Sequence, residues 1–329
     1  MIFCLPTGFF ASTFVANLSL QEILALSPCD SLSQSTNRLG FSQVIKKPKF
    51  IYVEGIRLSP TLAEENVIFS LNFEPRENDI VVDSYPGCGS SWVLQIVYLL
   101  LNNAHLGKIT ETLSKEVCYL EAEGTQVETY KAPRIIKTHL PFNSIAYNEK
   151  AKYIYIARNV KDCCVSIFHI MKTFPEDYQF NNGTFEDLFE CFIRGEMEYN
   201  DYFDHLLPWW NYRQRENVLF LVYETMKKEP KEHVQIIAKF LGAHINEFIQ
   251  EQSKLQSVLR MSNILFMKLK VRDYASVVPK RKFFIREGVV GQWKNFLTGE
   301  QSRRIDNKFF QRTVDTPMNL LWKGMGVFD

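Results

Sequence analysis

Short, nearly continuous runs of apolar residues recur along the chain, separated by segments in which apolar residues return every three or four positions. The runs predict buried β-strands, and the periodic segments predict helices. The predicted strands are Asp79–Ser84, Arg134–Lys137, Tyr153–Ala157 and Asn217–Tyr223, and the predicted helices are Ser90–Leu101, Asp162–Met171 and Glu232–Leu241. Because buried strands that alternate with helices are typical of a sheet covered on both faces, we predict an α/β fold: a central, mostly parallel sheet flanked by helices.

The first 48 residues differ in pattern from the rest of the chain. No charged side chain occurs between Met1 and Leu20, but Pro6 and Gly8 interrupt the apolar run that a secretory signal or a membrane anchor requires. We therefore expect an N-terminal extension over residues 1–48, either disordered or weakly signal-like, and one folded domain over residues 49–329. The expected location is cytoplasmic without stable membrane insertion; secretion or anchoring through residues 1–20 stays open as the alternative.

Charge and cysteine content exclude some classes of protein. The 329 residues include 38 Lys and Arg against 37 Asp and Glu, a net charge of +1. Since no general basic field exists, we do not expect a nucleic-acid partner, although one local basic pocket could hold a small anion. The 7 cysteines are odd in number and show no Cys-x-x-Cys spacing, which predicts reduced thiols and no metal site.

A glycine-containing loop joins the first predicted strand to the helix that follows it. Gly87 and Gly89 allow backbone amides to approach an anion, and Ser90 and Ser91 open the helix, whose N-terminus attracts negative charge. The loop is not a Walker motif, because no Lys follows the glycines. On this segment alone, a tight turn capped by Ser is an equally good interpretation.

Four segments together resemble the cytosolic sulfotransferase family. They are YPGCGSSW at 85–92, KTHLPF at 137–142, ARNVKDCCVS at 157–166 and IREGVVGQWKN at 285–295, in the family's order and spacing. The resemblance extends from about Phe50 to the C-terminus and implies the P-loop-like sulfotransferase fold. The family transfers a sulfuryl group from 3′-phosphoadenosine-5′-phosphosulfate (PAPS) to a hydroxyl or amine on a small acceptor, without a metal.

His139 and Lys137 are the catalytic candidates. A histidine is neutral near pH 7, because its ordinary pKa is about 6.5, so His139 could act as the general base that takes the proton of the acceptor. Lys137 precedes it by two residues and therefore lies on the same face of the strand, where it could contact the sulfate or its bridging oxygen.

The resemblance also implies a set of residues that bind the donor nucleotide. Arg158 and Ser166 match the positions that hold the 3′-phosphate, and Arg286 and Gly288 match a loop that closes over it. Trp92, Tyr223 and, more loosely, Ser253 match positions around the adenine. The complete set is Gly87, Cys88, Gly89, Ser90, Ser91, Trp92, Arg158, Ser166, Tyr223, Ser253, Arg286, Glu287 and Gly288.

Three features depart from the family pattern. Gly87 stands where the phosphate loop carries a lysine, and losing one such donor can cost about 3–4 kcal/mol in the transition state. Glu287 stands where a basic residue is expected. In the short dimer motif, Lys294 and Thr298 remain but two further positions differ, so a homodimer stays open.

Three functions consequently compete. The first is an active sulfotransferase, and the second is a catalytically impaired relative that still binds nucleotide or a small ligand. A P-loop nucleotide kinase is the third, and the absent Walker lysine disfavours it. The acceptor pocket is assigned to Phe142, Phe168, Phe174 and Tyr178, although each of these could equally belong to the core. Such an aromatic pocket suits a phenol, a catecholamine or another small alcohol.

Overall fold

A computed structural model describes residues 45–104, 115–274 and 284–328. These residues belong to one compact unit, Ile45–Asp329, so the expected N-terminal extension lies outside the described residues up to Val44. The start of the unit is held by main-chain hydrogen bonds. The Lys46 N–H donates to Asp187 Oδ1 at 3.0 Å, and the Lys49 N–H donates to the Tyr178 carbonyl at 2.7 Å.

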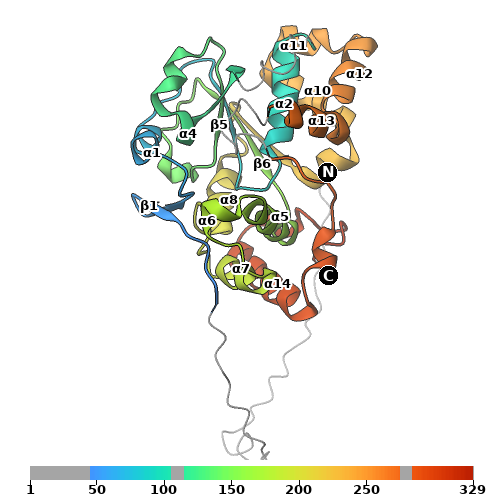
Figure 1. Cartoon of the computed structure of the whole chain (residues 1–329). Coiled ribbons are helices and arrows are strands. Elements are labelled where there is room, and N and C mark those ends of the chain that lie inside the picture. The colour runs from blue at the N-terminus through green and yellow to red at the C-terminus, as the bar shows by residue number, and fades with distance from the viewer. Residues whose placement is uncertain (1–44, 105–114, 275–283, 329) are drawn as a thin grey trace, which may run out of the picture. The chain divides into compact units, whose positions relative to one another are not determined.

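Five parallel strands form the central sheet, in the order β4-β5-β3-β6-β7 (Figure 1). They are β3 (Ile80–Asp83), β4 (Val117–Tyr119), β5 (Ile135–Thr138), β6 (Lys152–Ala157) and β7 (Val218–Val222). Four of them lie where the sequence predicts strands, whereas β4 was not predicted because it has only three residues. A separate antiparallel hairpin pairs β1 (Ile51–Val53) with β2 (Ile56–Leu58).

Alternate residues of each strand enter two different apolar clusters, as expected for a sheet buried on both faces. Val82, Ile154 and Ile156 pack with one group of helices. This group contains α2 (Ser90–Leu101), α9 (Tyr223–Lys228), α10 (Pro230–Leu241), α11 (Ala243–Phe248), α12 (Gln252–Met261) and α13 (Ile264–Tyr274) (Figure 1).

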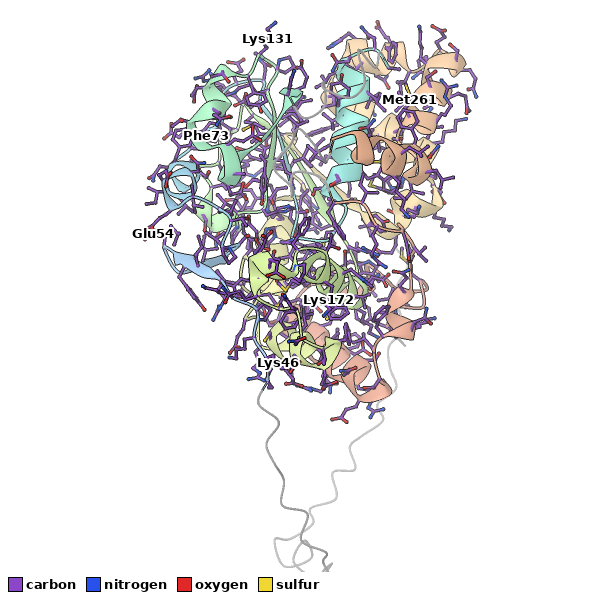
Figure 2. The ribbon with its side chains drawn as sticks, viewed as in Figure 1. Lys46, Glu54, Phe73, Lys131, Lys172 and Met261 are labelled. Carbon is purple, nitrogen blue, oxygen red and sulfur yellow. The ribbon has the colours of Figure 1, made fainter. Side chains whose placement is uncertain are left out.

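The alternate positions Val81, Tyr153 and Tyr155 face the second cluster. Its elements are α1 (Glu64–Leu71), α4 (Leu120–Glu123), α5 (Val160–Thr173), α6 (Pro175–Tyr178), α7 (Phe185–Ile193), α8 (Tyr202–Tyr212) and α14 (Gly299–Thr313), with 3-10 turns at Gly124–Thr129, Phe142–Ser144, Gln292–Asn295 and Pro317–Leu320. Figure 2 shows side chains filling the space on both sides of the sheet, with Met261 on one side and Phe73 on the other. None of the helices within the described ranges combines the length and the apolar character needed to cross a membrane.

The register of the sheet determines which chain segments lie next to each other at its carboxyl edge. Asp83, the last residue of β3, lies opposite Thr138 of β5 and Tyr155 of β6. The chain segments that follow β3 and β5 therefore leave the sheet side by side, at the edge where parallel α/β sheets bind their ligands.

Candidate active site

A cavity of about 400 Å³ opens at the carboxyl edge of the sheet. Its wall combines the segments after β3, β5, β6 and β7 with residues of α5, α12, α13 and the segment 284–288. The predicted residues that line it are Gly87, Gly89, Ser90, Ser91, Trp92, Lys137, His139, Arg158, Ser166, Phe174, Tyr178, Tyr223, Arg286 and Gly288. Motifs up to 200 residues apart in the sequence thus surround one space.

Both glycines of the loop after β3 are required by its geometry. Gly87 has φ 82° and Gly89 has φ 108°, values that residues with a side chain rarely adopt. A Cβ on Gly87 would lie 3.0 Å from Ser166 Cβ and Oγ, and one on Gly89 would lie 2.7 Å from the Tyr223 ring. The loop therefore presents bare backbone to the cavity at the N-terminus of α2, which is the arrangement that favours an anion.

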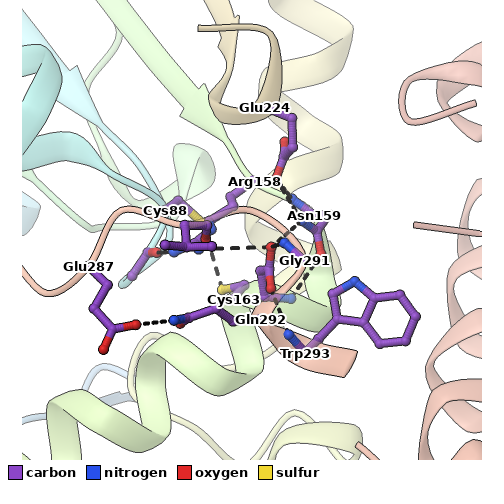
Figure 3. Close-up of polar contacts among 12 residues, drawn as sticks. Cys88, Arg158, Asn159, Cys163, Glu224, Glu287, Gly291, Gln292 and Trp293 are labelled. Atoms are coloured by element: carbon purple, nitrogen blue, oxygen red, sulfur yellow. Dashed lines mark hydrogen bonds and ion pairs between the residues drawn. The ribbon is translucent and has the colours of Figure 1, made fainter. Parts of the chain in front are cut away.

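The Cys88 side chain does not line the cavity. It is buried beneath the loop, and its Sγ lies 3.7 Å from Cys163 Sγ on α5 (Figure 3). Burial raises the pKa of the Cys163 thiol well above its ordinary value, because an apolar surrounding disfavours the thiolate. Both thiols act as small apolar groups that pack the loop onto α5.

Arg158 joins two loops of the site. Its Nη1 donates to the Gly87 carbonyl at 3.1 Å and its Nη2 donates to the Val289 carbonyl at 3.0 Å. The guanidinium lies 4.6 Å from the centre of the Tyr223 ring, and the contact with Asp162 is longer than a hydrogen bond, at 3.9 Å. Within the described residues, the buried Nε of Arg158 has no hydrogen-bond partner. A donor that is buried at a cavity wall in this way is suited to a bound anion.

Asp162 anchors the C-terminal loop of the site, a role that the sequence did not suggest. Its Oδ2 accepts the Gly291 N–H at 2.7 Å and the Asn159 side-chain amide at 3.0 Å, and its Oδ1 accepts the Trp293 N–H at 3.0 Å (Figure 3). Asn159 also donates to Glu224 Oε1 at 2.6 Å. These buried bonds hold the loop that carries Arg286 and Gly288 against α5.

Glu287 points away from the cavity, although its neighbours line it. Its carboxylate accepts a hydrogen bond from Gln292 and lies 3.4 Å from Arg286 Nη1 (Figure 3). About half of its side-chain surface is exposed, at 52%. This carboxylate is therefore partly solvated and hydrogen-bonded, and it is not among the groups that line the cavity.

At one end of the cavity, Trp92 meets Tyr223 edge to face at 5.8 Å. Ser253 does not reach this region, because it is exposed in the first turn of α12 and bonds to Glu251. Nine residues of helix separate it from Ser262, about 13 Å along the axis. Ser262, at the opposite end of α12, lines the cavity in its place.

His139 sits between the two halves of the cavity. Its Nδ1 lies 2.6 Å from the Ser84 carbonyl oxygen. Because a carbonyl can only accept, Nδ1 carries the proton and the Nε2 lone pair is left to accept another. Burial, and then the nearby Lys137, lower the pKa of His139 well below 6.5, so the ring is neutral.

The His139 backbone is also fixed on both sides. Its N–H donates to Glu121 Oε1 at 2.6 Å, and its carbonyl accepts from His205 Nε2 at 3.0 Å. Burial raises the pKa of Glu121 to about 7, partly offset by the His139 N–H and the charge of Lys137. The Lys137 ammonium lies 4.2 Å from the centre of the Tyr119 ring.

The other half of the cavity is mainly aromatic, and its membership differs from the predicted one. Phe174 and Tyr178 line it, whereas Phe142 and Phe168 do not. Phe142 follows Pro141 into a 3-10 turn and packs 4.2 Å from the Tyr212 ring. Phe168 lies on the side of α5 that meets Phe185, at 5.4 Å. Both therefore belong to the core.

Within the described residues, we find no group of three or more His, Cys, Asp or Glu side chains that could hold a metal ion.

A family model described as a sulfotransferase domain matches residues 77–317. The chain belongs to the sulfotransferase family. Sulfotransferase 1C2 from Oryctolagus cuniculus is 31% identical over 284 residues, which cover 80% of this chain and 92% of that protein. Sulfotransferase 1 family member D1 from Mus musculus is 31% identical over 290 residues, covering 82% and 95%.

A solved structure supports the same fold. The crystal structure of mouse sulfotransferase SULT7A1 complexed with PAP superposes with a TM-score of 0.68 at 27% identity, covering 84% of this chain and 98% of that one. The predicted α/β fold with a central parallel sheet is thereby confirmed. The assignment of the chain as a sulfotransferase enzyme is also confirmed.

Some residues that line this sulfotransferase cavity belong to none of the motifs recognised in the sequence. Tyr119 and Tyr199 flank the His139 ring at 5.9 and 5.6 Å, and their hydroxyls lie 3.0 Å apart. Glu198 brings a carboxylate into the aromatic half, and Lys227 brings an ammonium group to the Trp92 end. Tyr119 reaches the cavity at the end of β4, Glu198 and Tyr199 through a turn in which Tyr199 has φ 61°, and Lys227 from α9.

Proposed function

We propose that this sulfotransferase moves a sulfuryl group from PAPS to the hydroxyl or amine of a small aromatic acceptor, with His139 as general base. The observation that carries the proposal is the hydrogen bond from His139 Nδ1 to the Ser84 carbonyl. It leaves the Nε2 lone pair as the proton acceptor of a neutral ring, in a cavity with a backbone-lined loop in one half and aromatic side chains in the other.

The residues present fit the donor nucleotide. The unpartnered Nε of Arg158 and the hydroxyl of Ser166 offer buried donors for the 3′-phosphate. Gly87 and Gly89 have left-handed φ values and no side chain, and so allow the backbone amides and the α2 N-terminus to meet the phosphosulfate. Arg286 adds a second guanidinium, and Trp92 and Tyr223 offer ring faces for the adenine. The PAP complex of the similar mouse SULT7A1 supports this choice of donor.

His139 takes the proton of the acceptor hydroxyl through Nε2 while the acceptor oxygen forms its bond to sulfur. The bond between sulfur and the bridging oxygen breaks, and the nucleotide phosphate leaves with the electron pair. Lys137 and the loop amides stabilise the charge that develops on that phosphate. His139 as base can contribute roughly 100- to 10,000-fold to the rate.

Gly87 supports a second candidate, a nucleotide-binding protein with impaired catalysis. The resemblance leads us to expect a lysine after Pro86, and its ammonium would add a further positive charge near the departing phosphate. Here the backbone at Gly87 is left-handed and closely packed on Ser166. Lys137 is then the remaining cation next to His139 on this side of the cavity.

Calorimetry with 3′-phosphoadenosine-5′-phosphate, paired with transfer of radiolabelled sulfate to a panel of phenols and amines, separates the two candidates. We expect binding and transfer in the native protein, and loss of transfer with unchanged nucleotide binding in His139→Ala. Nucleotide binding without transfer, identical in His139→Ala, would instead establish the impaired protein. Equal competition by ATP would overturn the roles given to Arg158 and Ser166.

A further inference from the structure

His205 contacts the main chain of the proposed base without itself lining the cavity. Its side chain is fully buried, and its Nε2 lies 3.0 Å from the carbonyl oxygen of His139. Because a carbonyl can only accept, the His205 Nε2 carries the proton and donates the hydrogen bond. His139 lines the cavity, whereas His205 is not among the residues that do. One histidine therefore acts on the other through the backbone.

The second ring nitrogen of His205 also has a partner. The Tyr155 hydroxyl lies 3.0 Å from Nδ1. Burial lowers the pKa of His205 to about 4, so the ring is neutral, and Nδ1 accepts from the hydroxyl. For the same reason, the 3.7 Å contact between Nε2 and Asp83 Oδ1 is not an ion pair. The two hydrogen bonds together determine the tautomer and the orientation of the ring.

Helix α8 holds His205 in place through a residue one turn further along. Trp209 lies four residues after His205, on the same face of the helix, and its Nε1 donates to Asp83 Oδ2 at 2.9 Å. Asp83 ends β3 and pairs with Tyr155 of β6. The Tyr155 ring stacks on the rings of both His205 and Trp209, at 5.7 and 5.3 Å. The sheet itself thus fixes the position of His205.

The hydrogen bond to the His139 carbonyl matters because of what the His139 ring must do. Its Nε2 has to point at the acceptor oxygen, and a displacement of about 1 Å can cost about 100-fold in rate. The backbone that carries the ring is held by Glu121 at the N–H and by His205 at the carbonyl. Without the donor on His205, this buried carbonyl would lose a partner, and rotation of the peptide toward another donor would turn the ring.

We propose that His205 is a positioning residue of this sulfotransferase: its Nε2–H fixes the peptide that follows His139 and so keeps His139 Nε2 directed at the acceptor. The proposal rests on His139 being the base, as in the proposed function, and adds a residue that belongs to none of the motifs. The alternative is a purely structural role, in which the buried ring of His205 packs α8 against the sheet. Positioning affects the chemical step, whereas packing affects stability.

Two amide substitutions separate the hydrogen bond from the packing. In His205→Gln the amide extends far enough to bring a donor close to the position of Nε2, whereas in His205→Asn it is one methylene shorter and does not. With saturating donor, we expect His205→Asn to lose roughly 10- to 100-fold in kcat, with the KM of the acceptor changed less than about threefold. The kcat of His205→Gln should stay within about fivefold of the native value.

Nitrogen-15 NMR of histidine-labelled protein detects the same arrangement without requiring turnover. In the native protein we expect a neutral His139 ring protonated at Nδ1 and a neutral His205 ring protonated at Nε2, since each of these nitrogens faces a carbonyl. His139→Ala and His205→Gln assign the two sets of signals. The His139 signals should shift or broaden in His205→Asn, because the ring is no longer held in one orientation, and should keep their native positions in His205→Gln.

Leu206→Ala is the matched control for lost stability. Leu206 is the next residue of α8, is fully buried and belongs to the same apolar cluster as Trp209. Its truncation leaves a cavity and lowers stability, which denaturation measures, but removes no hydrogen-bond donor. We expect the kcat and the His139 signals of Leu206→Ala to match those of the native protein. If Leu206→Ala loses kcat as His205→Asn does, lost stability explains both, and the positioning role is overturned.

The native protein provides a test that does not depend on the folding of any variant. A native His205 ring protonated at Nδ1 would overturn the proposal, as would a native kcat in His205→Asn.

Failure of the proposed function has a different signature. If the native protein transfers no sulfate, but the His139 signals change in His205→Asn and not in His205→Gln, His205 positions the ring and the transfer reaction is wrong. If the native protein transfers sulfate and both variants match it in kcat, the reaction stands and the positioning role does not.

Discussion

Asp162 Oδ2 accepts the backbone N–H of Gly291 at 2.7 Å, across 129 residues of sequence. The same carboxylate accepts the Trp293 N–H through Oδ1, so one buried side chain fixes the direction of the loop that supplies Arg286 and Gly288. The part of the cavity wall that Arg286 and Gly288 form therefore depends on a residue that the described cavity lining does not include.

We expect Asp162→Asn to weaken this anchor, because an amide keeps one acceptor oxygen and turns a donor toward a second N–H. The free energy of unfolding should fall by about 1–3 kcal/mol, and affinity for 3′-phosphoadenosine-5′-phosphate should fall with it. Chemical denaturation and calorimetry measure the two effects. Asp204→Asn, at a carboxylate whose side chain is 64% exposed, should alter neither by much. Equal nucleotide affinity in both variants would contradict the anchoring role.

Gly87→Ala should reduce nucleotide affinity. The left-handed backbone costs about 1–2 kcal/mol with any side chain, and the new Cβ would lie 3.0 Å from Ser166, a residue assigned to the 3′-phosphate. Gly55→Ala provides the matched control, because Gly55 has φ 77° with no atom within 4 Å of the added Cβ. Both variants should lose stability through the left-handed backbone, Gly87→Ala should lose more through the crowding at Ser166, and only Gly87→Ala should bind the nucleotide more weakly.

The left-handed backbone at Gly87 also affects the variant that restores the lysine expected at this position. Gly87→Lys carries the strain and the crowding of Gly87→Ala, so we expect no gain in sulfate transfer from the added charge. A rate above that of the native protein, measured with saturating donor, would show instead that the loop adapts and that the absent lysine limits catalysis.

The pH dependence of transfer should reflect the low pKa of His139. Since the neutral ring is the form that we propose acts as the base, activity should be present above this pKa and be lost as the pH falls through it, well below 6.5. The profile of kcat/KM with a phenol of high pKa should therefore stay flat from pH 7.5 down past 6.5. Lys137→Met removes a positive charge that lowers the pKa, so the acid limb should move upward. Lys172→Met, on an exposed lysine outside the cavity lining, should leave the limb in place.

Glu121 should impose a pH dependence of opposite sign on stability. Its pKa in the folded protein is raised to about 7 from an ordinary 4.5, so the folded state holds a proton that the unfolded state has released between these values. This part of the stability is present below pH 4.5 and is lost as the pH rises toward 7. Glu121→Gln, which keeps an acceptor for the His139 N–H, should gain up to about 3 kcal/mol relative to the native protein over that range. Denaturation at a series of pH values measures the difference, and a parallel pH dependence in both proteins would contradict it.

Prediction from sequence succeeded where local patterns are long. Helix α2 occupies the predicted residues 90–101, and β6 begins one residue before the predicted Tyr153, because apolar residues dominate both elements. Strand β4 was not predicted, because its three residues, Val117–Tyr119, are too few to show a period. Its pairing with β5 nevertheless brings Tyr119 beside His139, which no local signal could indicate.

The two parts of the cavity also differ in how well the sequence predicted their lining residues. The motifs gave Gly87, Arg158 and Ser166, which all line the cavity, because the phosphate sites that the resemblance implies are short loops next to helix N-termini. The acceptor half is built from side chains on unrelated turns, so aromatic content alone could not separate Phe168, which packs in the core, from Tyr199, which lines the cavity. Likewise, nothing in the sequence around Ser253 indicates that the far end of α12 is the part that reaches the site.

The partner of His139 Nδ1 is a main-chain oxygen, and every amino acid at position 84 supplies one. The Ser84 hydroxyl is consequently not needed for the hydrogen bond that sets the tautomer of the proposed base, although this fully buried position limits the size of the side chain. The hydrogen bond depends instead on the pairing of Asp83 with Thr138, which the apolar residues of β3 and β5 maintain together. This hydrogen bond therefore does not depend on the chemistry of the side chain at position 84, but on its small size and on the placement of the two strands.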